Sequence, residues 1–467
     1  MTDRCAPDEI LGLDSNTFKD LEIFEAGAGQ ASLFDFCNQS RTEGGAAVLR
    51  RRMEQPWSTA VRIRSTQESV TFIATHPQVF SKLPSAYVIV STEAYMREIL
   101  PAVDYRNPLE FALGALQMWT NQDSHYFSIV RGVQATARMI RALRAFLVQP
   151  GLASLRGELV PLIREMRSLL RRPHMARVPD QEIGHWGMWR MLRLDQVLRT
   201  QEKNTVTRLL ELVYEIDALF AIAEATRKHG FNMPVIEQGL PRVDVEGLVH
   251  PYLERPVANP VALNQDQRVL FLTGPNMAGK TTYLRAFATA LYLAQLGMGV
   301  PATSFRFVPV QWLFSSISLS DDLRQGVSYF RAEALRVKAV AQAVTDGHKV
   351  VALMDEPFKG TNVKDAFDAS LAILERLSAR ENCLFMFSSH HIELRDHLHV
   401  ANGQVDCRYF EAEETAGRLR FDYRLRSGIS EQRLGMRVLR EEGIFELLDA
   451  LPTPVDNHTP GAATVES

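Results

Sequence analysis

The chain has 467 residues, of which 46% are hydrophobic and 23% are charged, and its formal net charge is -3. This composition is typical of a soluble globular protein, and the length exceeds what one compact core accommodates, so two or three domains are expected. No segment has the length and apolarity of a membrane span. The four cysteines lie far apart and none forms a CxxC pair, which argues against a disulfide framework or a zinc site. A reducing compartment, and therefore a cytoplasmic location, is expected.

The first half of the chain has the spacing of helices. Residues 1–20 show no pattern and are expected to form a tail. From residue 32 to 76 apolar residues recur at helical spacing with a break at Pro56, which predicts two helices. Helical spacing continues over residues 94–170 and 192–228. An all-α region is therefore predicted.

Within this region, residues 131–177 contain ten arginines and two acids, a local charge of +8. Two interpretations remain open. The arginines form either a solvated helix face that meets acidic neighbours, or a surface that contacts phosphates, for which the planar guanidinium is well suited. No recognisable DNA-binding motif accompanies them. On the second interpretation, the candidate DNA contacts are Arg138, Arg141, Arg164, Arg167, Arg171 and Arg172.

From Val269 onward, short apolar runs alternate with helical segments, which predicts an α/β unit with a parallel sheet covered on both faces. The run 269–273 leads into a glycine loop and a predicted helix over 281–295. The spacing of Gly274 and Gly279 fits a P-loop, in which Lys280 reaches the outer phosphates of a nucleotide and Thr281 holds Mg²⁺. The predicted nucleotide-binding residues are Gly274, Pro275, Asn276, Met277, Ala278, Gly279, Lys280, Thr281 and Thr282.

Two further apolar runs end in residues that suit nucleotide hydrolysis. Asp355 and Glu356 follow a run about 75 residues after the P-loop, the position of a Walker B pair. There Asp355 would bind Mg²⁺ through water and Glu356 would orient or activate the attacking water. His390 ends the next run and either senses the γ-phosphate or is merely structural. The histidines around it lack the spacing of a metal site. The sequence therefore predicts an ATPase that uses ATP and Mg²⁺.

At these residues the chain resembles the MutS family of DNA mismatch-repair ATPases. The family's P-loop TGPNMxGK[ST]T is matched by residues 273–282, and its Walker B motif, DE followed by [RK]GT, by residues 355–361. Residues 389–394 resemble its histidine switch, and residues 326–333 its trans-acting signature. By this resemblance Ser328 completes the ATP site of a partner, so a homodimer with composite sites is implied.

The resemblance also implies a domain order. Residues 1–20 would be a tail, residues 21–235 an all-α core and lever domain, residues 236–450 a P-loop ATPase domain of the ABC-like kind with a C-terminal dimerisation segment, and residues 451–467 a disordered tail. Mismatch-recognising members of the family carry a Phe-x-Glu wedge, and no Phe-x-Glu occurs in this sequence. A divergent, short form without the mismatch-binding and connector domains is therefore expected.

The function implied is a DNA-binding ATPase that couples ATP binding and hydrolysis to recognition of a DNA structure in repair or recombination, without sensing mismatches directly. DNA and a second copy of the chain are the expected partners, and no membrane is involved. The alternative is an ATP-switched scaffold or regulator that binds protein or RNA.

Overall fold

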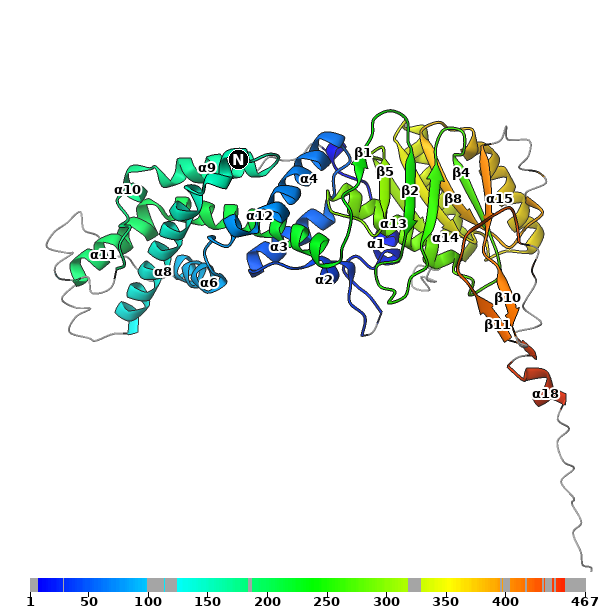
Figure 1. Ribbon diagram of the computed structural model, residues 1–467, viewed down its shortest axis with the longest axis horizontal. Coiled ribbons are helices and arrows are strands. Elements are labelled where there is room, and N and C mark those ends of the chain that lie inside the picture. Colours follow the sequence, from blue (N-terminus) through cyan, green and yellow to red (C-terminus); the bar gives the residue numbers. More distant parts are fainter. Residues whose placement is uncertain are drawn as a thin grey trace, which may run out of the picture.

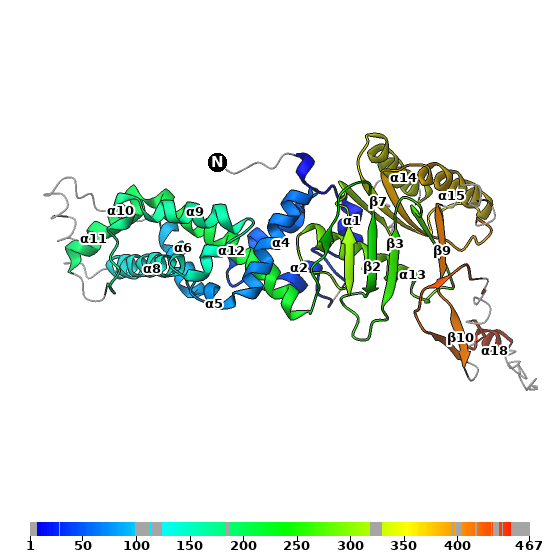
Figure 2. The same cartoon turned by 45° about the horizontal axis from the view of Figure 1, so that its top comes forward.

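A computed structural model gives the architecture of the protein (Figure 1). It describes residues 7–27, 29–98, 113, 124–183, 187–317, 329–394, 397, 404–415, 418–430, 432, 439–440 and 442–449. The molecule is elongated, with helices at one end and the β-sheets at the other in both views (Figures 1 and 2). The predicted combination of helices and sheets is confirmed.

Up to Lys228, every regular element in the described part of the chain is a helix. Helix α12 (Lys203–Lys228) is the longest and packs against α3, α4, α6 and α9. The Asp217 carboxylate of α12 accepts hydrogen bonds from the backbone N–H and hydroxyl of Thr42, at 2.9 and 2.7 Å, and so fixes the start of α3. None of these described helices has the length and apolarity needed to cross a membrane. The other helices of this half are η1 (Pro7–Glu9), α1 (Ser15–Asp20), α2 (Leu33–Cys37), α3 (Glu43–Glu54), α4 (Ala60–Thr75), α5 (Pro77–Phe80), α6 (Ala86–Arg97), α8 (Ser124–Leu147), η2 (Pro150–Ser154), α9 (Leu159–Leu170), α10 (Pro173–Ala176), α11 (Met188–Gln196) and the π-helical turn η3 (Val197–Gln201).

A tail is expected over residues 1–20, but residues 12–20 pack against the larger sheet. Helix α1 lies against strand β6 (Trp312–Ser316). The Asp20 carboxylate accepts hydrogen bonds from the Ser315 hydroxyl and the Ile317 N–H, both at 2.8 Å. The Asp20 carboxylate thus pairs with groups about 300 residues away in the sequence. Local sequence patterns cannot predict such a pairing.

The larger sheet has the strand order β12-β9-β4-β8-β7-β6, and all neighbours are parallel except β12 and β9. Alternate side chains face opposite sides, because successive residues of a strand point in opposite directions. Leu270 and Leu272 join the core around α13, whereas Val269 and Phe271 pack with residues of α14 and α15. The elements are β4 (Val269–Thr273), α13 (Lys280–Gln295), α14 (Tyr329–Thr345), β7 (Val350–Asp355), α15 (Val363–Ser378), β8 (Cys383–Ser388), β9 (Val405–Tyr409) and β12 (Arg426–Ser427).

A second sheet, of order β1-β5-β2-β3, lies between the helices and the larger sheet (Figure 1). It contains β1 (Val235–Ile236), β2 (Val243–Leu248), β3 (Asn259–Leu263) and β5 (Ser304–Phe307). A hairpin of β10 (Ala412–Thr415) and β11 (Arg418–Phe421) and the short helix α18 (Ile444–Asp449) follow. The expected disordered tail, residues 451–467, lies outside the described residues.

Helix α13 connects the larger sheet to the helical half. Thirteen of its sixteen residues are buried. Near its end, the Tyr292 hydroxyl donates to the carbonyl of Met53, at 2.6 Å. The Gln295 amide donates to the carbonyls of Trp57 and Val310, at 3.0 and 3.1 Å, and accepts the Val310 N–H at 2.8 Å. The corner between α3 and α4 is thereby fastened to the end of α13.

Replacing Gln295 with Leu should lower the free energy of unfolding by about 2–4 kcal/mol, because one buried N–H and two buried carbonyls lose their partner. Urea unfolding followed by circular dichroism measures the loss. The control is Gln342→Leu on α14, whose exposed amide donates only to Asp346. That change should cost less than about 0.5 kcal/mol. Equal losses for the two variants would contradict a structural role for the Gln295 amide.

Candidate active site

The loop between β4 and α13 depends on backbone conformations that favour glycine. Gly274 has a φ of 137° and Gly279 a φ of 104°. A Cβ atom on Gly274 would lie 2.6 Å from the carbonyl oxygen of Phe410, so no side chain fits there. Met277 is also left-handed, with a φ of 69°. Such a loop turns successive backbone N–H groups toward one point, where they and the start of α13 can bind an anion.

Lys280 is the first residue of α13 and is only 4% exposed. Its Nζ donates to the carbonyl oxygens of Gly274 and Pro275, at 2.7 and 3.2 Å, and lies 3.5 Å from a Glu356 oxygen. Burial lowers the pKa of Lys280, and the nearby carboxylates of Glu356 and Asp355 oppose that shift. The ammonium group therefore lies directly over the glycine loop, where it can reach a bound phosphate.

Asp355 and Thr281 come together at the edge of the sheet. Asp355 ends β7, and the Thr281 hydroxyl donates to its Oδ2 at 2.6 Å. The other oxygen of Asp355 accepts the hydroxyl of Ser388, which is its register partner at the end of β8. A hydroxyl and a carboxylate that reach the same point are oxygen ligands of the kind that Mg²⁺ prefers. These residues therefore fit the predicted cation.

Nitrogen atoms of three side chains lie close to the Glu356 carboxylate. His390 Nε2 lies 2.7 Å from its Oε1, and Lys359 Nζ lies 2.5 Å from its Oε2, with Lys280 on a third side. Burial by itself would raise the pKa of Glu356, but the hydrogen bonds from His390 and Lys359 outweigh it and hold that pKa at about 2. Glu356 is therefore an ionised hydrogen-bond acceptor beside the phosphate loop.

Two residues that the sequence did not predict at this site also lie here. Lys359 is part of the Walker B resemblance, but only the structure shows its contact with Glu356. The ring of Tyr423 would lie 3.2 Å from a Cβ atom on Gly279, and its side chain is 45% exposed. An exposed aromatic ring beside a phosphate loop is suited to stacking on a nucleobase. Tyr423 is distant in sequence, so no spacing could have revealed this contact.

The other predicted residues of the loop occupy consecutive positions between β4 and α13. Pro275 and Ala278 are buried, whereas Asn276, Met277 and Thr282 are exposed, and Met277 is 75% exposed. Ser328, the predicted trans-acting residue, lies outside the described residues.

The predicted DNA-contacting arginines lie on α8, on α9 and directly after α9, elements of the helical half (Figure 2), and they divide into two groups. The guanidinium groups of three of them contact the protein itself: Arg141 the carbonyl of Gln181, Arg167 that of Leu147, and Arg172 the hydroxyl of Thr205. The side chains of the other three have no hydrogen-bond or ion-pair partner among the described residues: Arg138, Arg164 and Arg171. The structure therefore holds three of the six guanidinium groups against the protein and leaves the other three without such a contact.

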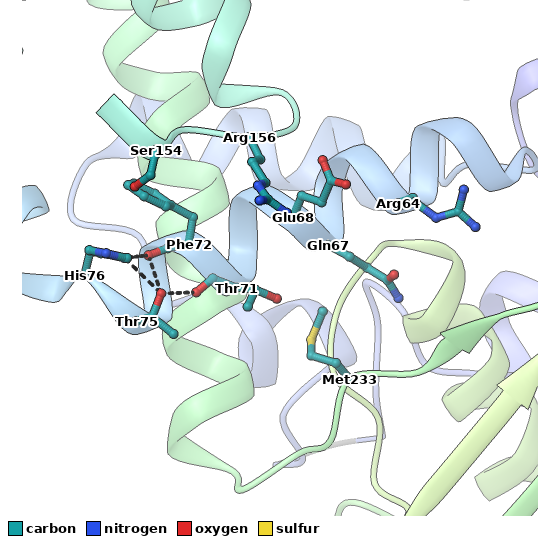
Figure 3. Close-up of a pocket in the computed structure, with 10 residues that line it drawn as sticks. All are labelled: Arg64, Gln67, Glu68, Thr71, Phe72, Thr75, His76, Ser154, Arg156 and Met233. Atoms are coloured by element: carbon teal, nitrogen blue, oxygen red, sulfur yellow. Dashed lines mark hydrogen bonds between the residues drawn. The ribbon is translucent and has the colours of Figure 1, made fainter. Parts of the chain in front are cut away.

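A separate groove of about 400 Å³ lies along α4 (Figure 3). The stacked rings of Phe72 and His76 form part of its wall, and Arg156 and Met233 line it from other elements. None of its lining residues belongs to the phosphate loop or to the Asp355–Glu356 pair. This groove is therefore distinct from the site around Lys280.

Comparison with known proteins agrees with the resemblance. Residues 270–448 match the model of MutS domain V. The chain is 32% identical over 250 residues to the DNA mismatch repair protein MutS 2 of Halobacterium salinarum, an alignment that covers 51% of this chain and 28% of that protein. It is 31% identical over 264 residues to the DNA mismatch repair protein MutS of Natronomonas pharaonis, covering 55% and 30%. The alignments thus cover less than a third of each relative's length.

The depressed pKa of Glu356 predicts a pH dependence of stability in the nucleotide-free protein. Its pKa is about 2 in the folded chain against an ordinary value of 4.5, so its ionised form stabilises the fold above pH 4.5 and this contribution is lost as the pH falls toward 2. Between about pH 5 and 3.5, wild type should lose about 1 kcal/mol more stability than Glu356→Gln. Urea unfolding at both pH values measures the difference. Parallel losses in the two proteins would contradict the ionic contacts described for Glu356.

Proposed function

Because the chain is a member of the MutS family, we propose that it is a DNA-binding ATPase that couples ATP binding and hydrolysis to recognition of a DNA structure in repair or recombination. The observation that carries the proposal is the convergence of Lys280, Thr281 and the Asp355–Glu356 pair at one edge of the sheet. Each has the chemistry that hydrolysis of a nucleoside triphosphate requires.

We propose a division of the chain into two main units. Residues 21–235 would form the helical core and lever domain, and residues 236–450 the ATPase domain with its dimerisation segment. The change from helices to strands between Lys228 and Val235 supports this boundary, as does the family match over residues 270–448. Residues 7–20 would belong with the ATPase domain, because α1 packs on β6.

In this proposal the loop of residues 274–282 holds the phosphates of ATP with its backbone N–H groups. The Lys280 ammonium releases the carbonyls of Gly274 and Pro275 and pairs with the outer phosphates. Thr281 and Asp355 hold Mg²⁺, which when bound neutralises charge on the phosphate oxygens. The Tyr423 ring stacks on the base.

Glu356 would orient or activate the attacking water. Its carboxylate is ionised and accepts hydrogen bonds, so it can orient a water molecule toward the terminal phosphate. His390 shares one oxygen of that carboxylate and reaches the site from the open side, since its side chain is 46% exposed. It would respond when a γ-phosphate approaches Glu356.

A chain of contacts supports coupling between this site and the helical half. Gln295, at the far end of α13, bonds the backbone of Trp57. The Trp57 indole donates to the Thr66 hydroxyl at 3.1 Å, and that hydroxyl donates to Glu158, the residue before α9. Helix α9 carries Arg164. A shift of α13 would therefore be transmitted to α9, and so to Arg164, through a series of hydrogen bonds.

We propose that the exposed guanidinium groups of Arg138, Arg164 and Arg171 contact the DNA backbone. They are free to meet phosphates, whereas Arg141, Arg167 and Arg172 would first have to leave their partners within the protein. Because the 467 residues hold no Phe-x-Glu wedge, the proposed recognition does not depend on unstacking a mismatched base pair.

The working unit proposed is a homodimer with composite ATP sites. Ser328, by resemblance, would approach the γ-phosphate bound by the partner. In such a dimer the partner would cover the exposed phosphate loop, in which Met277 is 75% exposed.

The ATPase proposal predicts different effects for two substitutions. Lys280→Ala removes the cation that faces the outer phosphates and should abolish ATP binding, whereas Glu356→Gln should bind ATP normally and lower turnover by about 100-fold or more. Equilibrium binding of a fluorescent ATP analogue and phosphate release measure the two effects. Glu356→Gln turning over at the wild-type rate would refute the role given to Glu356. A protein that sediments as a monomer and whose turnover per chain does not change with protein concentration would refute the composite site.

The DNA proposal predicts a change in salt dependence. Replacing Arg164 and Arg171 together with Ala should flatten the slope of log affinity against log salt by about 2, without altering preference between sequences. Fluorescence anisotropy on matched duplex, single-mismatch duplex and four-way junction measures the slope. The matched control is Arg227→Ala, because Arg227 is already paired with Glu224.

Two outcomes of the same measurement would overturn parts of the proposal. Binding to the mismatch about tenfold tighter than to matched duplex would refute recognition without mismatch sensing. Absence of binding to any DNA at low salt would favour the alternative, an ATP-switched scaffold that binds protein or RNA.

A further inference from the structure

Glu333, on the second turn of α14, is a charged residue that is only 2% exposed. Its carboxylate forms no ion pair among the described residues. Instead, it accepts hydrogen bonds from backbone N–H groups of the loop after β7. Its Oε1 accepts the N–H of Phe358 at 2.8 Å and that of Lys359 at 3.2 Å. Its Oε2 lies 3.5 Å from the N–H of Gly360. A buried carboxylate thus satisfies three successive donors of one loop.

That loop has an unusual backbone. Glu356 has a φ of 50° and Phe358 a φ of 68°, so two non-glycine residues in three are left-handed. Each such residue costs of order 1 kcal/mol and persists only where surrounding contacts hold it. The first of the two is fixed by β8, since the Glu356 N–H donates to the carbonyl of Ser388 at 3.0 Å. The second depends on α14.

Helix α14 holds Phe358 from two sides. The N–H of Phe358 donates to Glu333, and its ring, 3% exposed, packs against the ring of Phe330 with centroids 5.8 Å apart. Asn362 then begins α15 by capping it, because its side chain accepts the N–H of Asp365 at 2.9 Å. The Glu333 carboxylate is thus the polar anchor between the two ends of the loop.

We infer that Glu333 is a positioning residue for the ATPase reaction: by binding the N–H groups of residues 358–360, it keeps the loop in the left-handed conformation that directs the Glu356 carboxylate toward the phosphate loop. This inference rests on the proposed function. The conformation also brings Lys359 Nζ back to within 2.5 Å of Glu356 Oε2. Release of the loop would therefore move both the carboxylate and one of the cations that keep it ionised.

Glu333 should influence the rate of ATP hydrolysis and not the affinity for ATP. The contacts expected to hold ATP come from the P-loop, Thr281 and Tyr423. Among the described residues, Glu333 accepts its side-chain hydrogen bonds from residues 358–360 and from none of these groups. Loss of the Glu333 anchor should therefore change the rate of hydrolysis and leave the affinity for ATP nearly unaltered. A residue that only stabilised the fold would change both together or neither.

The test compares two substitutions at Glu333. Glu333→Leu removes the acceptor and should lower turnover about tenfold or more, with ATP affinity within about threefold of wild type. Glu333→Gln keeps one carbonyl oxygen, which can take the place of Oε1 and accept the N–H groups of Phe358 and Lys359, so turnover should stay within about threefold of wild type. The control is Glu375→Leu on α15, an exposed acid that has no side-chain partner among the described residues.

A second measurement does not depend on hydrolysis. Hydrogen–deuterium exchange of a peptide that spans residues 356–362 should become about tenfold faster in Glu333→Leu and remain at the wild-type rate in Glu333→Gln. If the Leu variant does not fold, Glu333→Asp, whose shorter side chain cannot reach all three N–H groups, takes its place in both measurements.

Slow ATP turnover and fast hydrogen–deuterium exchange in Glu333→Leu, with both near the wild-type rate in Glu333→Gln, would support the inference. Fast exchange with unaltered turnover, or exchange that does not change, would overturn it. A wild-type protein that hydrolyses no ATP would instead refute the proposed function, and the exchange measurement would still decide whether Glu333 holds the loop.

Discussion

Helix α13 is the element on which the rest of the structure depends. It begins at the glycine loop, passes between the larger sheet and the helical half with thirteen of sixteen residues buried, and ends at Gln295. A helix buried on nearly all sides cannot shift without carrying its neighbours, because protein interiors are close-packed. The phosphate loop and the corner between α3 and α4 therefore contact opposite ends of one buried helix.

The site at the start of this helix depends on compensation of charge. Lys280 and Glu356 are both withdrawn from water, and each would be costly to bury alone. Together with Lys359 and His390 they form a cluster in which the carboxylate stays ionised, as the pKa of about 2 for Glu356 indicates. In the proposed function, arrival of phosphate would add negative charge to this balance, which is consistent with the role proposed for His390.

Two buried carboxylates accept hydrogen bonds from backbone N–H groups that follow neighbouring strands. Asp20 fixes the end of β6 through the N–H of Ile317, and Glu333 fixes the loop that follows β7. Both loops leave the same edge of the sheet, because β6 and β7 are parallel neighbours. A side-chain acceptor can pair with the backbone N–H groups of a loop that forms no β-sheet hydrogen bonds. The backbone can therefore take the left-handed conformations seen at Glu356 and Phe358.

The sequence by itself determined the change from helical to strand periodicity, the β4–loop–α13 unit and the positions of Asp355, Glu356 and His390 at strand ends, because these features are local and follow from residue spacing. Only the tertiary structure decided what distant segments contribute: the packing of α1 on β6, the contact of Tyr423 with Gly279, and the attachment of residues 358–360 to Glu333. It also separated the arginines whose guanidinium groups contact the protein, such as Arg172, from those without such a contact, such as Arg164. Local patterns record the conformation of a segment, whereas partners tens to hundreds of residues away are selected by packing and by the need to pair every buried polar group.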